Sequence, residues 1–312
     1  MRELLFMNPV FKETIWGGDR LKKDYGYDIP SDHTGECWAI SAHPNGTGTV
    51  ASGTYAGWKL SELWDKHREL FGGIEGKEFP LLIKIIDAKA DLSIQVHPDD
   101  AYAAVNENGS LGKTECWYIL DCDPGADIIV GHNAKNHEEV EEMIRDGKWD
   151  EFIRVLPVHK GDFFQINPGT VHAIRTGTLI LETQQSSDVT YRLYDYDRLQ
   201  NGKPRELHID KSIDVIKAPF VPVTADGEET KVGDATITKL VTCPFYSVYK
   251  TCVNGRATIK NDKPFVNVSI LDGEGTVDGV AVKKGDHFII PAGYGDYTLE
   301  GNMFIISSDV PR

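Results

Sequence analysis

The sequence predicts a mainly β protein built from two jelly-roll units, with a few short helices inserted. Two observations support this fold class. Many short segments rich in β-branched and aromatic residues are separated by turns that contain glycine, and a stretch near the middle of the chain occurs again near its end. The chain has 312 residues, of which 40% are hydrophobic. This length suggests two domains, or one large β domain, and the hydrophobic fraction is enough for a sizeable core.

Seven segments are predicted to be strands because they are rich in Val, Ile, Tyr, Phe and Thr. They are FPLLIKIID (79–87), TECWYILD (114–121), DFFQIN (162–167), GTLILETQ (177–184), DATITKLV (234–241), FVNVSILD (265–272) and HFIIPAG (287–293). The segment VDGV (277–280) predicts a tight hairpin, because Asp-Gly suits a two-residue turn. Such short, closely spaced strands favour an antiparallel sandwich or barrel over alternating β-α units.

Three short helices are also expected. Apolar residues from Leu60 to Phe71 follow helical spacing, with Ser61 as a candidate N-cap. A second helix lies around 140–144, with Asn136 as its candidate cap and Gly147 as its end. The third helix is expected in PDDAYAAVNENG (98–109).

The repeat gives the fold its most specific signal. KGDFFQINPGTVH (160–172) aligns without gaps with KGDHFIIPAGYGD (284–296), at an offset of 124 residues. WYILD (117–121) resembles VSILD (268–272) at an offset of 151, so the first copy holds 27 extra residues, which we place in the helical stretch 133–155. Lys-Gly-Asp, a strand and Pro-x-Gly are typical of a cupin-type jelly roll. We predict a catalytic metal-binding cupin domain over 1–235 and a metal-free cupin-like domain over 236–312.

The two copies differ in their polar residues. Glu115 and His172 of the first copy align with Val266 and Asp296 of the second. The fold does not require the glutamate and the histidine, because the second copy lacks both. Their presence in the first copy therefore indicates a function.

The segment DLSIQVHPDD (91–100) adds two more polar side chains. Gln95 and His97 alternate with Ile94 and Val96, so in a strand they point to one side. Taken singly, each polar residue is better explained as an ordinary core or turn residue. Taken together, on three strands of one unit, four residues predict a metal site: Gln95, His97, Glu115 and His172. This nitrogen and oxygen set suits one Zn²⁺, with other divalent metals possible, and the weak amide ligand leaves the metal electrophilic.

The bulk composition excludes several classes of partner. The net charge of −15 argues against nucleic-acid binding and against binding to anionic membranes. No apolar stretch approaches the roughly 18 residues that span a bilayer, and the N-terminal segment lacks the pattern of a signal peptide. Five cysteines without a C-x-x-C motif favour reduced thiols in the cytoplasm. The oligomeric state does not follow from the sequence.

Four segments closely resemble the type I phosphomannose isomerases, especially their short bacterial form: SIQVHPDD, GKTECWYIL, NPGTVHAI and SSDVTYRLYDYDR. IWGG (15–18) and TGECWAIS (34–41) fit the start of that family as well. The resemblance implies a zinc-dependent cupin enzyme that interconverts mannose 6-phosphate and fructose 6-phosphate through an enediol or enediolate. It also implies that the four predicted ligands hold the metal.

The resemblance further implies that Arg192, Lys113 and Asp188 are active-site residues. Arg192 would stabilise the enediolate or contact the phosphate. Lys113 would bind phosphate or handle a proton, and Asp188 would act as a base or orient Arg192. From spacing alone, a surface charge or an ion pair explains Lys113 and Asp188 equally well. Only 57 positions separate Glu115 from His172, so the large helical domain of longer family members is absent and a substrate lid should be reduced or built differently.

Two other classes of protein remain open at this point. The first is a different cupin enzyme, such as a metal-dependent dioxygenase, which would need O₂, or a nucleotide-sugar epimerase, which relies on a histidine base without four ligands. The second is a non-catalytic cupin that binds a sugar phosphate without exchanging the hydrogen on C2. The sequence does not identify the proton-transfer base.

Overall fold

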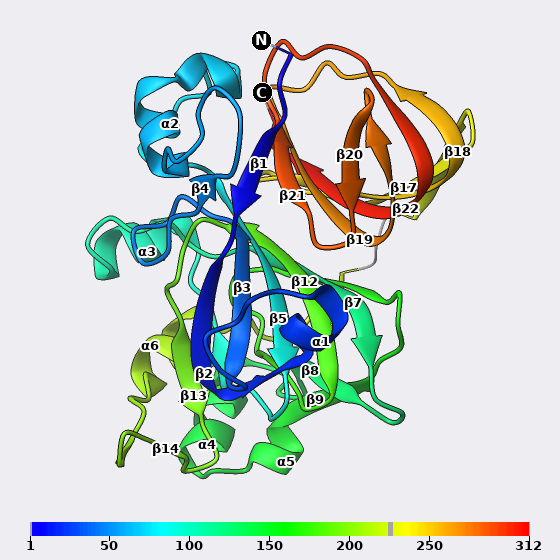
Figure 1. The fold of residues 1–312 in the computed structure, drawn as a ribbon. Coiled ribbons are helices and arrows are strands. Elements are labelled where there is room, and N and C mark those ends of the chain that lie inside the picture. The colour runs from blue at the N-terminus through cyan, green and yellow to red at the C-terminus, as the bar shows by residue number, and fades with distance from the viewer. Residues whose placement is uncertain (1, 224–226, 312) are drawn as a thin grey trace.

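The computed structural model describes residues 2–223 and 227–311, and within them the chain forms two β units (Figure 1). In the first unit, a six-stranded sheet has the order β10-β7-β12-β5-β2-β3. Its strands are β2 (Val10–Gly18), β3 (Thr34–Ile40), β5 (Leu81–Ala88), β7 (Glu115–Cys122), β10 (Phe163–Ile166) and β12 (Thr178–Gln185). This sheet carries one wall of the first unit.

The opposite wall is a sheet of five strands among the described residues, in the order β13-β6-β11-β8-β9. They are β6 (Ile94–Val96), β8 (Asp127–His132), β9 (Ile153–Pro157), β11 (His172–Ile174) and β13 (Tyr191–Tyr194). Apolar side chains from the two walls, including Trp117 and Ile86 facing Ile128 and Ile174, form one cluster between them. This packing of two antiparallel sheets makes a β-sandwich, and a small separate ribbon joins β14 (Leu199–Gln200) to β15 (Lys203–Pro204).

The second unit is a sheet of nine strands within the described residues, in the order β16-β17-β18-β22-β19-β21-β1-β4, with β20 paired to β19. Its strands are β1 (Leu5–Asn8), β4 (Thr49–Val50), β16 (Glu228–Val232), β17 (Ala235–Thr242), β18 (Ser247–Ile259), β19 (Val266–Val277), β20 (Val280–Lys283), β21 (His287–Ile290) and β22 (Tyr297–Asp309). The sheet curls around its own apolar core, which includes Val253, Ile270 and Phe288.

Helices are few and short, as predicted. They are α1 (Arg20–Tyr25), α2 (Leu60–Lys66), α3 (Asp100–Asn106), α4 (His137–Arg145), α5 (Trp149–Phe152) and α6 (Ile209–Val215), with a 3₁₀ helix at Arg68–Phe71. Helices α4 and α6 pack their apolar side chains on the outer face of the five-stranded sheet, at the lower end of the molecule in Figure 1. No helix among the described residues is long and apolar enough to cross a membrane.

Strand pairing confirms the internal repeat residue by residue. Ile166 of β10 pairs with Glu115 of β7, and Ile290 of β21 pairs with Val266 of β19. These two pairs are related by the offsets of 124 and 151 that the sequence alignment gives. The extra chain of the first copy carries α4 and α5, between β8 and β9, as expected.

Local predictions hold with one correction. The VDGV hairpin joins Val277 to Val280, and both Asp278 and Gly279 have positive φ, at 48° and 81°, as this two-residue turn requires. The correction concerns the helix expected over 60–71. It ends at Lys66, a separate 3₁₀ turn follows, and its N-cap position is Lys59 instead of Ser61. The Glu62 carboxylate accepts a hydrogen bond from the backbone N–H of Lys59 at 3.2 Å, so this N–H at the start of the helix has a partner.

The division at residue 235 stays a prediction, and strand pairing crosses it. Strand β1, at the N-terminus, pairs with β21 of the second unit, with Leu5 opposite Ile289. Because an uncovered sheet edge exposes unpaired backbone groups, the N-terminal strand completes a sheet that the C-terminal segment leaves open. The chain then enters the first unit through β2.

Candidate metal centre and adjoining cavity

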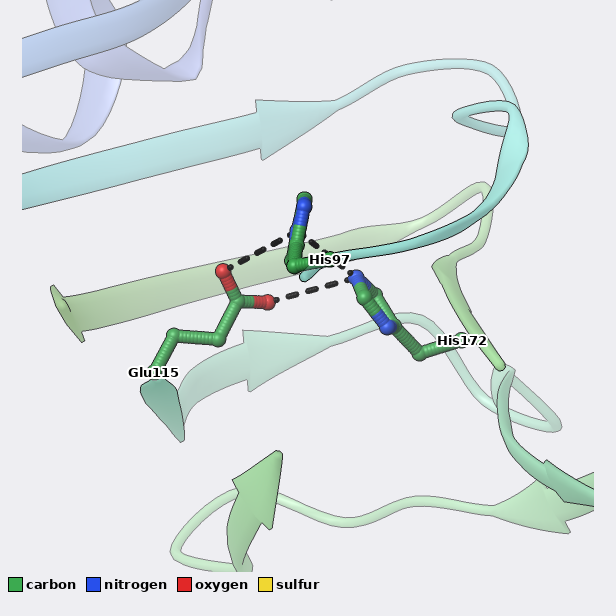
Figure 2. A group of neighbouring side chains, drawn as sticks. All are labelled: His97, Glu115 and His172. Atoms are coloured by element: carbon green, nitrogen blue, oxygen red, sulfur yellow. Dashed lines mark hydrogen bonds and ion pairs between the residues drawn. The ribbon is translucent and has the colours of Figure 1, made fainter. Parts of the chain in front are cut away.

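The predicted ligands come together at one end of the sandwich. Glu115 begins β7 of the six-stranded sheet, whereas His172 begins β11 and Gln95 lies on β6 of the opposite sheet. His97 follows β6 directly, and His172 pairs with Gln95 in the ladder between β11 and β6. Figure 2 shows the side chains of His97, Glu115 and His172 pointing toward one another.

Three of these side chains form a compact, buried cluster. The Nε2 atoms of His97 and His172 are 3.1 Å apart. The Glu115 carboxylate lies 3.5 Å from Nε2 of His97 and 3.4 Å from Nε2 of His172. All three side chains are at most 1% exposed. Such an arrangement of two imidazoles and a carboxylate offers one ligand atom from each residue.

Hydrogen bonds at the far side of each ring fix the tautomers. His97 Nδ1 is 2.8 Å from the Val189 carbonyl oxygen, and His172 Nδ1 is 2.8 Å from the Thr170 carbonyl oxygen. Because a carbonyl can only accept, each Nδ1 must carry the hydrogen, and a neutral ring then has a bare lone pair at Nε2. This is the usual orientation of metal-binding histidines, whose other ring N–H is held by an acceptor.

A shared cation would stabilise the facing Nε2 lone pairs of His97 and His172. Two Nε2 acceptors 3.1 Å apart cannot hydrogen-bond to each other. Of the two buried oxygens of Glu115, Oε1 has no donor among the described residues, and Oε2 has only the Lys113 ammonium, at 2.7 Å. Buried acceptors of this kind are costly unless a positive charge lies among them. A divalent ion bound by nitrogen and oxygen would satisfy all of them at once. The residues present therefore fit a metal.

Protonation states agree with metal binding. Burial, with the nearby Lys113 charge, lowers the pKa of His97 to about 3, and burial also lowers the pKa of His172. Burial alone would raise the pKa of Glu115, but Lys113 and His97 hold it well below its usual range. At neutral pH both rings are neutral and the carboxylate is ionised, which is the state in which these groups bind metals.

The two remaining cluster residues lie at its edges. The Lys113 ammonium is 2.7 Å from Glu115 Oε2 and 3.2 Å from His97 Nε2. The Gln95 amide nitrogen is 3.3 Å from His172 Nε2, and its oxygen accepts a hydrogen bond from Ser93. Because the oxygen and nitrogen of an amide exchange places by a half-turn of the group, Gln95 can present its oxygen to an ion held by the histidines.

A cavity of about 170 Å³ adjoins the cluster, and its lining includes Gln95, Lys113, Arg192 and Asp188. Arg192 lies on β13 directly opposite Gln95. Its guanidinium donates to the Ser93 hydroxyl at 3.3 Å and to the Glu206 carbonyl at 3.0 Å. Burial, with other arginines nearby, lowers the pKa of Arg192. All seven residues singled out from the sequence thus lie in or beside one site.

Asp188 occupies the exposed edge of that cavity. Its carboxylate accepts a hydrogen bond from the Asn45 side chain at 2.5 Å and lies 3.6 Å from Nε2 of His43. Among the contacts of the described residues, the guanidinium of Arg192 is held by Ser93 and Glu206 instead of by Asp188. The geometry therefore does not support the alternative in which Asp188 orients Arg192.

A buried charge cluster that was not predicted from the sequence lies in the same cavity. Lys84 of β5 lies 3.2 Å from Glu182 of β12 and 3.9 Å from Glu36 of β3, and all three line the cavity. The carboxylates raise the pKa of Lys84 although its burial acts in the opposite direction. One signal was visible, since Lys84 is the lone charge in the middle of the apolar strand FPLLIKIID.

The IWGG segment shapes one wall of the cavity. Trp16 lines the cavity, and the strand that carries it crosses β3 closely. A Cβ atom on Gly17 would lie 2.4 Å from the backbone nitrogen of Gly35, and one on Gly18 would lie 2.4 Å from Asp87. Only glycine permits this approach, so the motif has a packing reason as well as a place at the site.

Comparison with known proteins identifies the family of the chain. The model of the phosphomannose isomerase type I catalytic domain matches residues 4–120, and that of the mannose-6-phosphate isomerase cupin domain matches residues 236–310. The mannose-6-phosphate isomerase ManA of Bacillus subtilis is 54% identical over 96% of both chains. The chain belongs to the type I phosphomannose isomerase family. The family resemblance drawn from the sequence motifs is therefore confirmed.

Further phosphomannose isomerase relatives cover the whole chain. The mannose-6-phosphate isomerase of Streptococcus mutans is 48% identical over 99% of this chain and 98% of its own. A crystal structure of mannose 6-phosphate isomerase from Bacillus subtilis has a TM-score of 0.97 at 49% identity, covering 98% of this chain and 99% of that one. A phosphomannose isomerase structure from Salmonella typhimurium, at 15% identity and a TM-score of 0.76, shares the fold. The predicted fold class, two cupin-type units, is confirmed by these neighbours.

Proposed function

We propose that this phosphomannose isomerase interconverts mannose 6-phosphate and fructose 6-phosphate through an enediol or enediolate. The observation that carries the proposal is the pair of facing Nε2 lone pairs beside the ionised Glu115, next to a cavity that Lys113 and Arg192 line. Neither a purely structural core nor a metal-independent site needs two imidazole acceptors turned toward each other.

The ligand chemistry favours one Zn²⁺ ion per chain, held by His97, Glu115 and His172, with Gln95 as the fourth and weakest ligand. When bound, the metal supplies positive charge that favours a negative charge on the sugar oxygens. Two imidazoles, one carboxylate and one amide carry a net charge of −1, so the ion stays electrophilic. The donors are nitrogen and oxygen only, which separates this site from closed structural zinc sites built on thiolates.

Arg192 is suited to stabilise the negative charge that develops during the reaction. The isomerisation moves a proton between C2 and C1, and negative charge grows on the adjoining oxygens. Ser93 and the Glu206 carbonyl already hold the guanidinium in place, so its orientation costs nothing at the moment of reaction. Its place opposite Gln95 puts this charge on the cavity side of the metal centre.

Lys113 and Asp188 provide proton-handling groups at opposite sides of the cavity. The Lys113 ammonium lies against Glu115, deep in the site, and would donate to a sugar oxygen or to the phosphate. Asp188 lies at the open edge, where its carboxylate would accept a proton or a hydrogen bond from a sugar hydroxyl. Binding of the remote phosphate would position the reacting carbons between them. We place the enzyme in the cytoplasm, where its thiols stay reduced.

The test combines metal analysis with exchange of the C2 hydrogen of mannose 6-phosphate against solvent deuterium. The wild-type enzyme should hold one metal per chain and catalyse exchange together with formation of fructose 6-phosphate. Glu115→Gln and His172→Ala should lose both the metal and exchange, whereas His159→Ala, which changes a side chain that is 81% exposed, should keep both. Full activity in a metal-free preparation would overturn the proposal, as would binding of the sugar phosphate without any exchange.

A further inference from the structure

A second cavity, of about 520 Å³, lies between the two β units, away from the metal centre. Its walls come from β7 and β12 of the first unit and from β19 and β22 of the second, which lie next to one another in Figure 1. This volume falls within the roughly 300–1,000 Å³ typical of small-molecule pockets, which often lie at domain interfaces. The proposed reaction does not use this cavity.

Equivalent residues of the two repeat copies line this cavity. Lys160 and Lys284, the lysines of the two Lys-Gly-Asp turns, both line it. Leu179 of β12 pairs with Asp121 of β7, and Phe304 of β22 pairs with Asp272 of β19. These four residues are equivalent across the two copies, and all of them line the cavity. The interface between the units therefore brings two copies of the same surface, each with a lysine and a carboxylate, to face each other.

The charged side chains that line this cavity differ in how far they are paired. The Arg20 guanidinium bonds to both Asp24 and Asp121, so two carboxylates share one cation. Lys284 reaches only Asp272, at 3.9 Å, and among the residues the structure describes no carboxylate lies within ion-pair distance of Lys160. The cavity wall therefore offers carboxylate acceptors around Arg20 and two lysine ammonium groups with little or no carboxylate pairing.

Aromatic rings also line this cavity. The rings of Tyr118 and Phe304 are 5.6 Å apart and come from opposite units. The Lys284 ammonium lies 4.9 Å from the centre of the Tyr25 ring, which also lines the cavity. Tyr25 is partly buried, and within the described residues its hydroxyl group has no hydrogen-bond partner. A polar group so placed is satisfied best by a ligand or by solvent in the cavity.

We propose that the cavity between the two units binds a small polyhydroxylated anion, a sugar carboxylate or a sugar phosphate, with its anionic group at Lys160 and Lys284. Its hydroxyl groups would donate to the carboxylates of Asp24 and Asp121, and its carbon skeleton would lie against Tyr118 and Phe304. The site is separate from the metal centre, and it gives the metal-free unit a binding role of its own.

The experiment is calorimetric titration of the full-length, metal-loaded protein with three probes: gluconate, glucose 1-phosphate and the neutral polyol sorbitol. Saturable binding of gluconate, of glucose 1-phosphate or of both is expected, and the responding probe shows whether the site takes carboxylates or phosphates. Sorbitol should not bind, because it lacks the charge. The variant Lys160→Ala/Lys284→Ala should bind the anion about tenfold or more weakly.

Two further variants serve as controls for the location of the binding site. Lys283→Ala changes a neighbouring lysine that is 73% exposed and outside the cavity lining, and it should bind as the wild type does. Arg192→Ala should also retain this binding, because Arg192 belongs to the other cavity. The proposal is overturned if neither anion binds, if sorbitol binds equally, if the double lysine variant binds unchanged, or if Arg192→Ala abolishes the binding. A matching circular dichroism spectrum and melting temperature would show that each variant is folded.

Discussion

At the level of single residues, the surroundings of each histidine separate a metal ligand from a core residue. His287, in the second unit, is as deeply buried as His97, but both of its ring nitrogens have partners, the Ser269 hydroxyl and the Tyr27 hydroxyl, each at 2.8 Å. His97 and His172 donate from Nδ1 to backbone carbonyls and turn their Nε2 lone pairs toward each other. The Lys113 ammonium lies 3.2 Å from the Nε2 of His97, and the Gln95 amide nitrogen lies 3.3 Å from the Nε2 of His172. The first pattern completes a neutral core residue, and the second leaves room for a cation.

This difference predicts how acid affects stability. Burial lowers the pKa of His287 to about 3, below the value near 6.5 of an unfolded histidine. The unfolded chain therefore binds the extra proton first, and stability is lost as the pH falls from about 6.5 toward 3. For this group the loss at pH 5 should be about 2 kcal/mol relative to neutral pH.

Urea unfolding of the wild type and His287→Gln at pH 7 and pH 5 measures that loss. The substitution should reduce the difference between the two pH values, whereas the exposed control His159→Gln should leave it unchanged. An equal pH dependence in the wild type and in His287→Gln would contradict the assignment of this buried histidine as an acid-sensitive group.

A second prediction at this level concerns the guanidinium of Arg192. Arg192→Ala should retain the metal, because none of the three clustered ligands depends on its side chain, but kcat should fall by about 10²-fold or more, as for loss of one charge-stabilising donor. Steady-state assays with metal analysis test this. The control Arg145→Ala removes an exposed arginine that pairs with Glu141 and Asp210, and its kcat should match the wild type. An unchanged rate in Arg192→Ala would remove it from the catalytic groups.

At the level of elements, the repeat shows how one β unit is adapted for catalysis. Both copies keep the same register between β7 and β10 and between β19 and β21. Only the first copy places a carboxylate at the start of the β7 strand, where the second has Val266. The inserted helices α4 and α5 pack on the outer face of the first unit with Phe152 and Ile144 buried. The first copy therefore carries the ligand residue and the inserted helices on the same strand framework as the second copy.

The cap of α4 offers a test of the inserted segment. The Asn136 side chain accepts a hydrogen bond from the Glu139 backbone N–H at 2.8 Å. Asn136→Ala should lower the free energy of unfolding by about 1 kcal/mol, because a helix-end donor loses its partner. Urea unfolding measures this, and isomerase activity should not change. Lys135→Ala, the exposed neighbour, should leave stability unchanged, and equal stability of both variants would show that the cap contributes nothing.

At the level of the whole molecule, a metal at this site would join two sheets that apolar packing also holds together. Glu115 belongs to the six-stranded sheet, and His172 belongs to the five-stranded sheet. An ion bound to both would cross-link the walls of the sandwich in the folded state only. Ligands that bind only the folded state raise its stability, so metal occupancy should be visible in unfolding as well as in catalysis.

Chelation gives the corresponding prediction. Removal of metal with EDTA should lower the melting temperature of the wild type, and stoichiometric Zn²⁺ should restore it. Glu115→Gln should melt at the same temperature with and without chelator, because it no longer holds the ion. Differential scanning calorimetry measures each midpoint. A wild-type midpoint that does not respond to chelator would contradict a metal held between the two sheets.

The sequence alone determined seven of the strands, the repeat and the seven residues predicted for the site, but not the long strands β18 and β22 or the charge cluster around Lys84. Alternation and turn residues are local properties, so β5, β7 and β19 could be predicted from their own segments. The comparison of aligned copies then singled out Glu115 and His172, because a repeat shows which polar residues the fold does not need. The family motifs added Arg192, Lys113 and Asp188, which the structure places around one cavity.

Only the tertiary structure decided which groups touch one another. The pairing of Lys84 with Glu182 and Glu36 joins three strands far apart in sequence. The same is true of Ser93 holding Arg192, and of β1 completing the sheet of the second unit. The cavity between the two units likewise exists only when their equivalent surfaces meet. Such contacts depend on how elements that are distant in sequence pack together. The local sequence of each segment does not determine that packing.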